Sequence, residues 1–314
     1  MGRSFMRHLI SLDDLGDTDL ESIAARGVQF RHDPAVAGKP LDGQIVGTYF
    51  RKTSTRTRTA FSAAALRLGA QVLAYGPGDL QLNTGETIAD TGRVFSGMLD
   101  LLVARTAGDP LELREFAAPG GMSVVNAMTA DEHPTQALAD LTTLLDRFSG
   151  IEDLRVLYVG EGNNSAVALA LALSRFSGVR LELRTPPGYG LPEGVLARAE
   201  RQAGKHGASV LERNEPPAAG LAGEFDVVYT TRWQTTGTSK PDPRWREVFA
   251  PFQVDERLWD GGAEALFMHD LPAHRGEEVS AHVLDGERSI AFDQAENKMH
   301  SAMAVLEWVR SERP

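Results

Sequence analysis

One residue type and several sequence patterns are absent from this sequence of 314 residues. It has no cysteine, which excludes disulfides and thiolate metal sites within it and fits the reducing cytosol. The formal net charge of -11 argues against a general nucleic-acid-binding protein, because nucleic acid is itself strongly negative. It contains no apolar run of about 18 residues, and its first residues lack the apolar stretch of a signal peptide. We therefore expect a cytoplasmic protein without nucleic-acid or membrane partners.

The remaining composition is that of an ordinary globular protein. Apolar residues make up 42% of the chain and charged residues 24%. The length suits two domains of roughly 150 residues each. Short apolar runs alternate with segments of helical periodicity, a pattern typical of parallel sheets. The sequence predicts an α/β fold of two doubly wound domains, each with a mostly parallel sheet flanked by helices.

The pattern also predicts the individual elements and the domain boundary. In the first half, we expect strands at 44–50, 71–75, 101–104 and 123–126, and helices at 17–30, 55–68, 86–98 and 133–148. In the second half, we expect strands at 154–159, 179–184, 225–230, 265–268 and 289–292, and helices at 165–176, 193–206 and 294–310. The expected domains are residues 1–148, onto which the C-terminal helix 294–312 packs back, and residues 149–293. We expect mobile loops at 186–192 and 233–245.

A basic, hydroxyl-rich segment follows the first expected strand. Residues 51–58 read RKTSTRTR, and a helix begins within them. The N-terminus of a helix offers free N–H groups and the positive end of its dipole to an anion. Ser54, Thr55 and Thr57 add hydroxyl donors, and Arg56 adds a bidentate guanidinium. The segment favours a phosphate site, although a solvated basic helix start is the alternative.

This segment begins a resemblance to a known family. Residues 54–58 (STRTR) match the signature of the aspartate and ornithine carbamoyltransferases. Further matches follow in the same order along the chain: QLNTGET at 81–87, Arg105 after a strand, HPTQ at 133–136, and HDLPAHRGEE at 269–278. The chain therefore resembles the aspartate/ornithine carbamoyltransferase family over its whole length and is most similar to the ornithine type.

The resemblance implies a role for each matched residue toward carbamoyl phosphate. One set would hold the phosphate: Ser54, Thr55, Arg56 and Thr57, with Gln81 from a neighbouring subunit. A second set would polarise the carbonyl: Arg105, His133 and Thr57. A third set would accept hydrogen bonds from the carbamoyl amide: Gln136 and the Leu271 carbonyl, turned inward by a cis bond to Pro272. Arg275 would help to close the site. Taken singly, His133 could be a helix cap, Arg105 a surface ion-pair partner and Gln136 a solvent-facing side chain.

The expected acceptor site departs from the ornithine pattern. Asn164 matches the Asn that holds the substrate carboxylate in ornithine carbamoyltransferases. Thr231, however, replaces the Asp that binds the substrate's α-amine, and Asp270 replaces the Cys next to the attacking amine. Residues 235–237 (TTG) replace a Ser-Met-Gly loop. The resemblance therefore leaves the identity of the acceptor open.

Arg232 and Gln234 resemble instead the Thr-Arg-x-Gln of aspartate carbamoyltransferases, which holds the α-carboxylate. Aspartate itself is disfavoured, because Ala273 replaces the Arg that grips its second carboxylate and Asp270 would repel it. Our hypothesis is that Arg232 binds the acceptor's carboxylate, while Asp270 faces an amino group or accepts its proton. The alternative is that Arg232 and Asp270 pair with each other.

The resemblance implies a homotrimeric enzyme with sites shared between subunits, using carbamoyl phosphate and a small amino acid and needing no metal or organic cofactor. The expected reaction converts L-ornithine to L-citrulline, as in arginine biosynthesis. The alternatives are carbamoylation of another diamino acid, such as lysine or 2,3-diaminopropionate, and a non-catalytic phosphate-binding homologue. A dinucleotide site at residues 160–165 is disfavoured, because Ser165 occupies the third glycine position of that motif.

Overall fold

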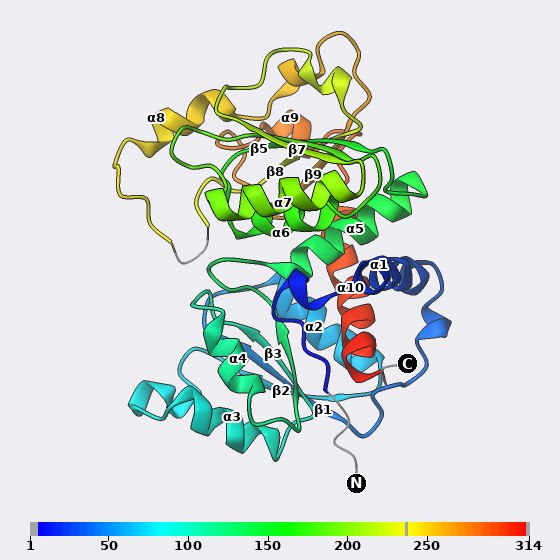
Figure 1. Ribbon diagram of the computed structural model, residues 1–314, viewed down its shortest axis with the longest axis vertical. Coiled ribbons are helices and arrows are strands. Elements are labelled where there is room, and N and C mark those ends of the chain that lie inside the picture. Colours follow the sequence, from blue (N-terminus) through cyan, green and yellow to red (C-terminus); the bar gives the residue numbers. More distant parts are fainter. Residues whose placement is uncertain (1–5, 236–237, 312–314) are drawn as a thin grey trace. The chain divides into compact units, whose positions relative to one another are not determined.

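Buried strands alternating with helices build two parallel sheets, one in each of two units of the chain (Figure 1). The computed structural model describes residues 6–235 and 238–311. Unit 1 comprises residues 1–146 and 296–314, and unit 2 comprises residues 147–295. The predicted fold class is confirmed, because both sheets are parallel and flanked by helices. None of the helices in the described ranges combines the length and the apolar character needed to cross a membrane.

The sheet of unit 1 has the strand order β2-β1-β3-β4, with parallel neighbours throughout. Its strands are β1 (Ile45–Phe50), β2 (Gln71–Tyr75), β3 (Leu101–Arg105) and β4 (Ser123–Asn126). Its helices are α1 (Asp17–His32), α2 (Arg56–Arg67), α3 (Ile88–Ser96), α4 (Leu111–Ala117), most of α5 (Pro134–Phe148) and α10 (Ala291–Arg310) from residue 296 on. Strands β1, β3 and β4 are almost wholly buried, whereas the edge strand β2 is largely exposed.

The C-terminal part of α10 packs on α1 within unit 1 (Figure 1). Arg26 forms an ion pair with Glu307 at 2.7 Å, and the indole of Trp308 donates to Asp19 at 2.7 Å. Residue 312, the last of the expected closing helix, lies outside the described residues. These contacts join the last helix of the chain to the first.

The sheet of unit 2 has the strand order β7-β6-β5-β8-β9, again with parallel neighbours. Its strands are β5 (Arg155–Val159), β6 (Arg180–Arg184), β7 (Ser209–Arg213), β8 (Val227–Thr230) and β9 (Leu266–His269). Its helices are α6 (Asn164–Leu173), α7 (Glu193–Lys205), α8 (Trp245–Phe249) and α9 (Ala281–Leu284). Short 3-10 helices occur at Leu12–Asp14, Pro34–Ala37, Gln81–Thr84, Leu221–Glu224, Ala250–Phe252 and Glu256–Trp259.

The predicted elements differ from the structure at one expected strand and at several elements that were not predicted. The strand expected at 289–292 is wrong: Ser289 forms only an isolated bridge to Phe267, and α10 begins at Ala291. Strand β7 was not predicted, because it lies at a sheet edge and buries only Val210 fully. Helices α4, α8 and α9 were not predicted either, since their 7, 5 and 4 residues give too short a periodic pattern.

Strand order decides which loops meet in each unit. In a parallel sheet, all carboxyl ends lie on one edge, where ligands bind in open α/β folds. In unit 1, neighbouring strands β1 and β3 therefore deliver residues 51–57 and Arg105 to the same edge. In unit 2, the adjacent strands β5, β8 and β9 deliver the residues at 160–165, 231–234 and 270–272.

Gly162 provides a test of how tightly the turn between β5 and α6 is packed. A Cβ at this position would lie 2.3 Å from the carbonyl carbon of Gly190 and 2.4 Å from the nitrogen of Leu191. Backbone atoms cannot yield as a side-chain tip can, so Gly162→Ala should lower the free energy of unfolding by about 2 kcal/mol or more. In α7, Gly194→Ala meets nothing within 4 Å and should raise it, by up to about 1 kcal/mol. Urea unfolding measures both variants, and similar values for the two would contradict the packing argument.

Candidate active site

The start of α2 forms the first part of the candidate site, in unit 1. Thr55 is the N-cap residue, but its side chain accepts no hydrogen bond from the described N–H groups of the helix. N–H groups at the start of a helix suit an anion, because they point along the positive end of the helix dipole. Arg56 is the first helical residue, and Thr57 is buried in the first turn. This arrangement has the donors that the phosphate prediction requires.

Arg105 reaches the same place because of strand register. It lies opposite Phe50 in the pairing of β1 with β3, and its carbonyl accepts from the N–H of Arg51 at 3.0 Å. Its side chain is buried, and Nη1 donates to the Thr57 hydroxyl at 3.3 Å. The structure thus brings together Thr57 and Arg105, as expected from the sequence.

His133 adds a neutral donor to this group. The side chain lies just before α5 and is buried. Burial, and then the positive charges of Arg105 and Lys298, hold the pKa of His133 well below its ordinary value. The imidazole is therefore uncharged at neutral pH. It can donate one hydrogen bond to a ligand without adding a third positive charge.

Lys298 is a member of this group that the sequence analysis missed. It lies on α10, is buried, and its ammonium donates to the side-chain oxygen of Gln136. Gln136 in turn donates to Asp140 at 2.8 Å, so both ends of its amide are fixed. The oxygen expected to accept from the carbamoyl amide already accepts from Lys298. The only sequence signal for Lys298 is the dense polar stretch QAENKMH within a helix that otherwise looks amphipathic.

Gln81 is not brought into this group within the described part of the chain. It lies in the exposed 3-10 turn Gln81–Thr84, and its side-chain oxygen accepts from the hydroxyl of Thr84 at 2.7 Å. Its expected contribution to a neighbouring subunit's site remains a prediction.

Asp270 organises the second set of candidate residues, in unit 2. The hydroxyl of Ser165 donates to its Oδ2 at 2.9 Å, and that of Thr231 donates to its Oδ1 at 2.9 Å. The three residues follow β5, β8 and β9, which lie side by side in the sheet. The Asp270 side chain is 13% exposed, so a ligand can still reach the carboxylate.

His269 does not neutralise Asp270. Its Nδ1 accepts a hydrogen bond from the N–H of Leu271 at 2.8 Å, which places the ring proton on Nε2. Nε2 then donates to the buried Glu278 at 3.2 Å. Although Nδ1 lies 3.6 Å from Asp270, it is a lone-pair nitrogen and carries no charge in this tautomer.

The guanidinium of Arg232 is suited to bind an anion. Its Nε is buried without a hydrogen-bond partner, and no other described residue pairs with its guanidinium. The alternative pairing with Asp270 is therefore not present. Gln234 donates to the carbonyl of Thr238 at 2.8 Å, and Asn164 is the first, buried residue of α6.

The remaining predicted residues have mixed outcomes. The bond between Leu271 and Pro272 is cis, as the resemblance implies. Arg275 instead makes a bidentate ion pair with Asp285, with N–O distances of 2.8 and 2.6 Å, and both side chains are exposed. That partner raises the pKa of Arg275. Thr236 and Gly237 of the expected acceptor loop lie outside the described residues.

One group among the described residues could offer ligands to a metal ion. His274, Glu277 and Glu278 each have a donor atom within 4.8 Å of the others. Glu278, however, already accepts from the N–H of His274 and from His269. These bonds give its burial a structural role that needs no ion.

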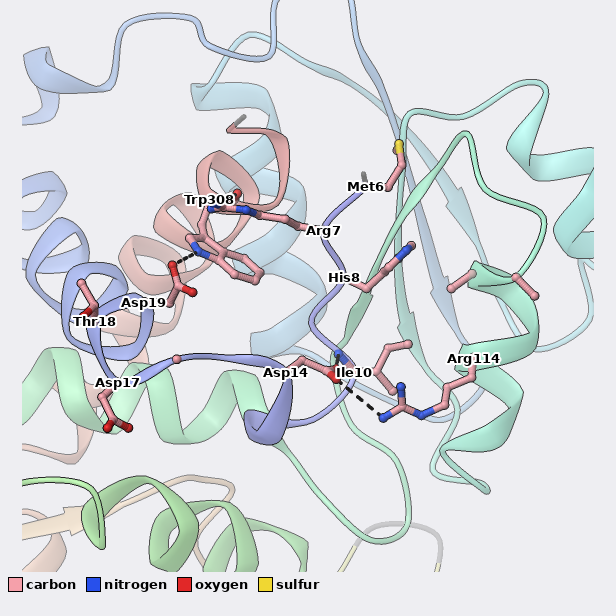
Figure 2. A pocket seen from close by; sticks show the side chains of 13 residues that line it. Met6, Arg7, His8, Ile10, Asp14, Asp17, Thr18, Asp19, Arg114 and Trp308 are labelled. Atoms are coloured by element: carbon pink, nitrogen blue, oxygen red, sulfur yellow. Dashed lines mark hydrogen bonds and ion pairs between the residues drawn. The ribbon is translucent and has the colours of Figure 1, made fainter. Parts of the chain in front are cut away.

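A cavity of about 850 Å³ lies elsewhere in unit 1 (Figure 2). Its polar walls pair with one another: Arg114 lies 3.7 Å from Asp14, and the guanidinium of Arg7 lies over the ring of Trp308 at 5.1 Å. None of the predicted site residues lines it. It is therefore separate from the two sets described above.

Comparisons with known proteins agree with this fold. Residues 7–146 match the family described as "Aspartate/ornithine carbamoyltransferase, carbamoyl-P binding domain", and residues 152–309 match its "Asp/Orn binding domain". The ornithine carbamoyltransferase of Symbiobacterium thermophilum is 39% identical over 305 residues, covering 96% of each chain. That of Gloeobacter violaceus is 37% identical over 303 residues, covering 96% of this chain and 95% of its own.

Solved structures give the same result. The ornithine carbamoyltransferase from Pyrococcus furiosus superposes with a TM-score of 0.88 at 35% identity, covering 98% of this chain and 97% of its own. The enzyme from Gloeobacter violaceus gives 0.85 at 35% identity, covering 98% and 99%. The fold and both matched domains define a transferase. The chain belongs to the aspartate/ornithine carbamoyltransferase family, which confirms the resemblance seen in the sequence.

The lowered pKa of His133 predicts how stability depends on pH. The unfolded chain binds a proton at this histidine near its ordinary value of 6.5, whereas the folded chain does so only at lower pH. The free energy of unfolding should therefore fall as the pH drops below about 6.5 toward the folded-state pKa. His133→Gln should flatten this dependence by up to about 1.4 kcal/mol per pH unit.

Urea unfolding of both proteins between pH 5 and 8 measures this effect. The variant keeps the contributions of His8 and His300, whose pKa values burial also lowers, so some dependence on pH should remain. Parallel curves for the two proteins would show that His133 takes up a proton equally well in both states.

Proposed function

We propose that this protein transfers the carbamoyl group of carbamoyl phosphate to L-ornithine, giving L-citrulline and phosphate. The observation that carries the proposal is the group formed by Thr57, Arg105 and neutral His133 beside the uncapped start of α2. The relatives named ornithine carbamoyltransferase support it. The same named relatives make a non-catalytic homologue the weaker alternative.

The chemistry needs donors at two places. Attack of a neutral amine on the carbamoyl carbon forms a carbon–nitrogen bond and an oxyanion. The carbon–oxygen bond to phosphate then breaks, and the departing phosphate takes the bonding electrons and the proton that the amine gives up. Arg105, Thr57 and His133 offer donors to the oxyanion, and an uncharged His133 does so without losing a proton to it. Ser54, Thr55, Arg56 and the N–H groups of α2 suit the departing phosphate. Lys298 adds a positive charge that offsets the dianion in a chain of net charge -11.

For the acceptor, we propose that Asp270 binds an ammonium group and Arg232 the carboxylate, with Asn164 assisting. The carboxylate that the ornithine enzymes carry at position 231 stands here at position 270, and the two side chains touch at 2.9 Å. The negative charge is thus kept but moved by one strand. The same shift favours the second candidate function, transfer to a diamino acid of another length, such as lysine or 2,3-diaminopropionate.

We also propose which part of the chain binds each substrate and how the chains assemble. Residues 1–148 with the helix at 294–312 would bind carbamoyl phosphate, and residues 149–293 the acceptor. The family matches at 7–146 and 152–309 support the roles of the two main segments, and the grouping of residues 296–314 with unit 1 supports the place of the last helix. A homotrimer would cover the exposed Leu66 on α2 and Leu73 on the edge strand β2 and would bring Gln81 to a neighbouring site. The absence of cysteine favours the cytoplasm.

Arg56→Ala tests the phosphate assignment. Removing the guanidinium takes away a charge-assisted contact to the donor and leaving group, so kcat/KM should fall at least about a thousand-fold with any acceptor. Arg58→Ala removes an exposed arginine two residues further along the first turn of α2, and its kcat/KM should stay within about three-fold of the parent. A colorimetric ureido-product assay measures both. Full activity of Arg56→Ala would contradict the site; a parent protein that releases no phosphate with any amine would revive the non-catalytic alternative.

The charge shift predicts the behaviour of paired variants. Asp270→Asn should lower kcat/KM for ornithine about a hundred-fold, because the ammonium loses its counter-charge while the side-chain shape is kept. Adding Thr231→Asp should recover at least about ten-fold, because the carboxylate returns to the neighbouring strand. The assay uses ornithine, lysine and 2,3-diaminopropionate in parallel. Unchanged kinetics in Asp270→Asn would remove this residue from the acceptor site, and a preference for another amine would identify the second candidate function.

A further inference from the structure

The ammonium of Lys240 is buried among aromatic rings in unit 2. Its side chain is 3% exposed, and Nζ lies 4.7 Å from the ring centroid of Tyr189, 5.4 Å from Trp245 and 4.6 Å from Phe249. Aromatic faces attract cations, most strongly when water is excluded. Phe249 also packs edge to face with Tyr189 and Trp245, at centroid distances of 4.8 and 5.5 Å. We call these three rings the aromatic cage.

A carboxylate completes the surroundings of the ammonium. Glu161 Oε1 lies 2.5 Å from Nζ, and Glu161 belongs to the turn between β5 and α6. Burying an unpaired ammonium is strongly unfavourable, so this partner is required for Lys240 to enter the cage. Removing either charge would leave the other desolvated.

Further contacts join the same turn to the loop after β8. Asn163 donates to the hydroxyl oxygen of Thr235 at 3.1 Å, and that hydroxyl lies 3.4 Å from Glu161 Oε2. Asn163 is also the N-cap of α6, where it accepts from the N–H groups of Ser165 and Ala166. Both residues that flank Gly162 in the turn are thus connected to the loop.

The two connected segments carry the residues of the acceptor site. Asn164 follows the N-cap directly, and Arg232 lies on the loop between β8 and Lys240. We propose that Lys240 is a positioning residue for the acceptor: seated in the aromatic cage against Glu161, it holds the loop that carries Arg232 in register with the turn that carries Asn164. The proposal rests on the acceptor roles given above for these two residues.

The use of a charged pair distinguishes positioning from plain packing. An apolar side chain could fill the cage without a desolvation cost, and replacing a buried ion pair by apolar residues often leaves stability unchanged or raises it. A buried pair instead selects one arrangement, because each charge accepts only its partner. Replacing both charges together should therefore disturb the loop's position more than the stability of the unit, whereas loss of Lys240 alone also leaves Glu161 without its partner.

Lys240→Met is the principal test, with steady-state kinetics and hydrogen exchange as readouts. KM for ornithine should rise about ten-fold or more, while kcat and KM for carbamoyl phosphate stay within about three-fold. Peptides covering 231–235 and 238–245 should exchange faster than in the parent. Lys240→Arg keeps the charge and should recover most of the affinity for ornithine. The double variant Lys240→Met/Glu161→Gln should lose less free energy of unfolding than Lys240→Met alone, because no unpaired carboxylate remains in it.

Arg155→Met is the matched control. Arg155 pairs with Asp226 at 2.8 Å in the same unit, but at the amino end of β5, away from the turn. This variant loses an ion pair of similar length and should keep both KM values and the exchange of the loop peptides. An equal rise of KM for ornithine in Arg155→Met, or unchanged KM and exchange in Lys240→Met, would overturn the proposal.

The exchange readout separates this inference from the proposed function. If the parent protein does not turn over ornithine, the proposed function is rejected. Faster exchange confined to the two loop peptides in Lys240→Met would still support the positioning role of Lys240. If the parent is active but the loop peptides of Lys240→Met exchange as slowly as those of the parent, the positioning role of Lys240 is rejected and the proposed function stands. A rise of KM for both substrates would also reject a role specific to the acceptor.

Discussion

Parallel pairing is the constraint on which both halves of the candidate site depend. When every neighbouring pair of strands runs the same way, all carboxyl ends reach one edge, and residues far apart in the chain become neighbours there. Phe50 and Arg105 are paired in register, so the residues after β1 meet the end of β3. Ser165, Thr231 and Asp270 meet for the same reason after β5, β8 and β9. Reversing any of these strands would disperse its loop to the opposite edge.

Local electrostatics then decides what the grouped residues can do. The chain is acidic overall, yet Arg105 and Lys298 are buried next to His133. Two fixed cations and burial keep the imidazole neutral, so the group can bind a dianion while retaining one uncharged donor. Unit 2 instead presents a carboxylate that accepts hydrogen bonds from two hydroxyls. Its guanidinium, that of Arg232, has no partner among the described residues. The two units therefore offer sites of opposite electrostatic character.

The sequence predicted what depends on local pattern and missed what depends on distant contacts. Strands such as β3 and β5 are apolar throughout, and the STRTR segment carries its chemistry within five adjacent residues. Strand β7 was missed because an exposed edge needs little apolar surface. Lys298 was missed because only the fold turns it toward His133 rather than toward solvent. The seat of Lys240 needs rings at 189, 245 and 249, which no spacing rule brings together. The exposed pair of Arg275 and Asp285 likewise follows from loop geometry rather than from the motif that contains the arginine.

The contact between Thr231 and Asp270 has a consequence for how such a site can change during evolution. The ornithine pattern places an acid at the first position and a thiol at the second, whereas this chain places a hydroxyl and an acid there. One route between the two patterns passes through a pair of acids at two positions whose side chains are in contact here, and the other passes through a pair with no charge. The first repels itself and the second loses its counter-ion, so neither single step preserves the site. The two positions must therefore change together for the site to be kept. The same condition applies to a change in the opposite direction.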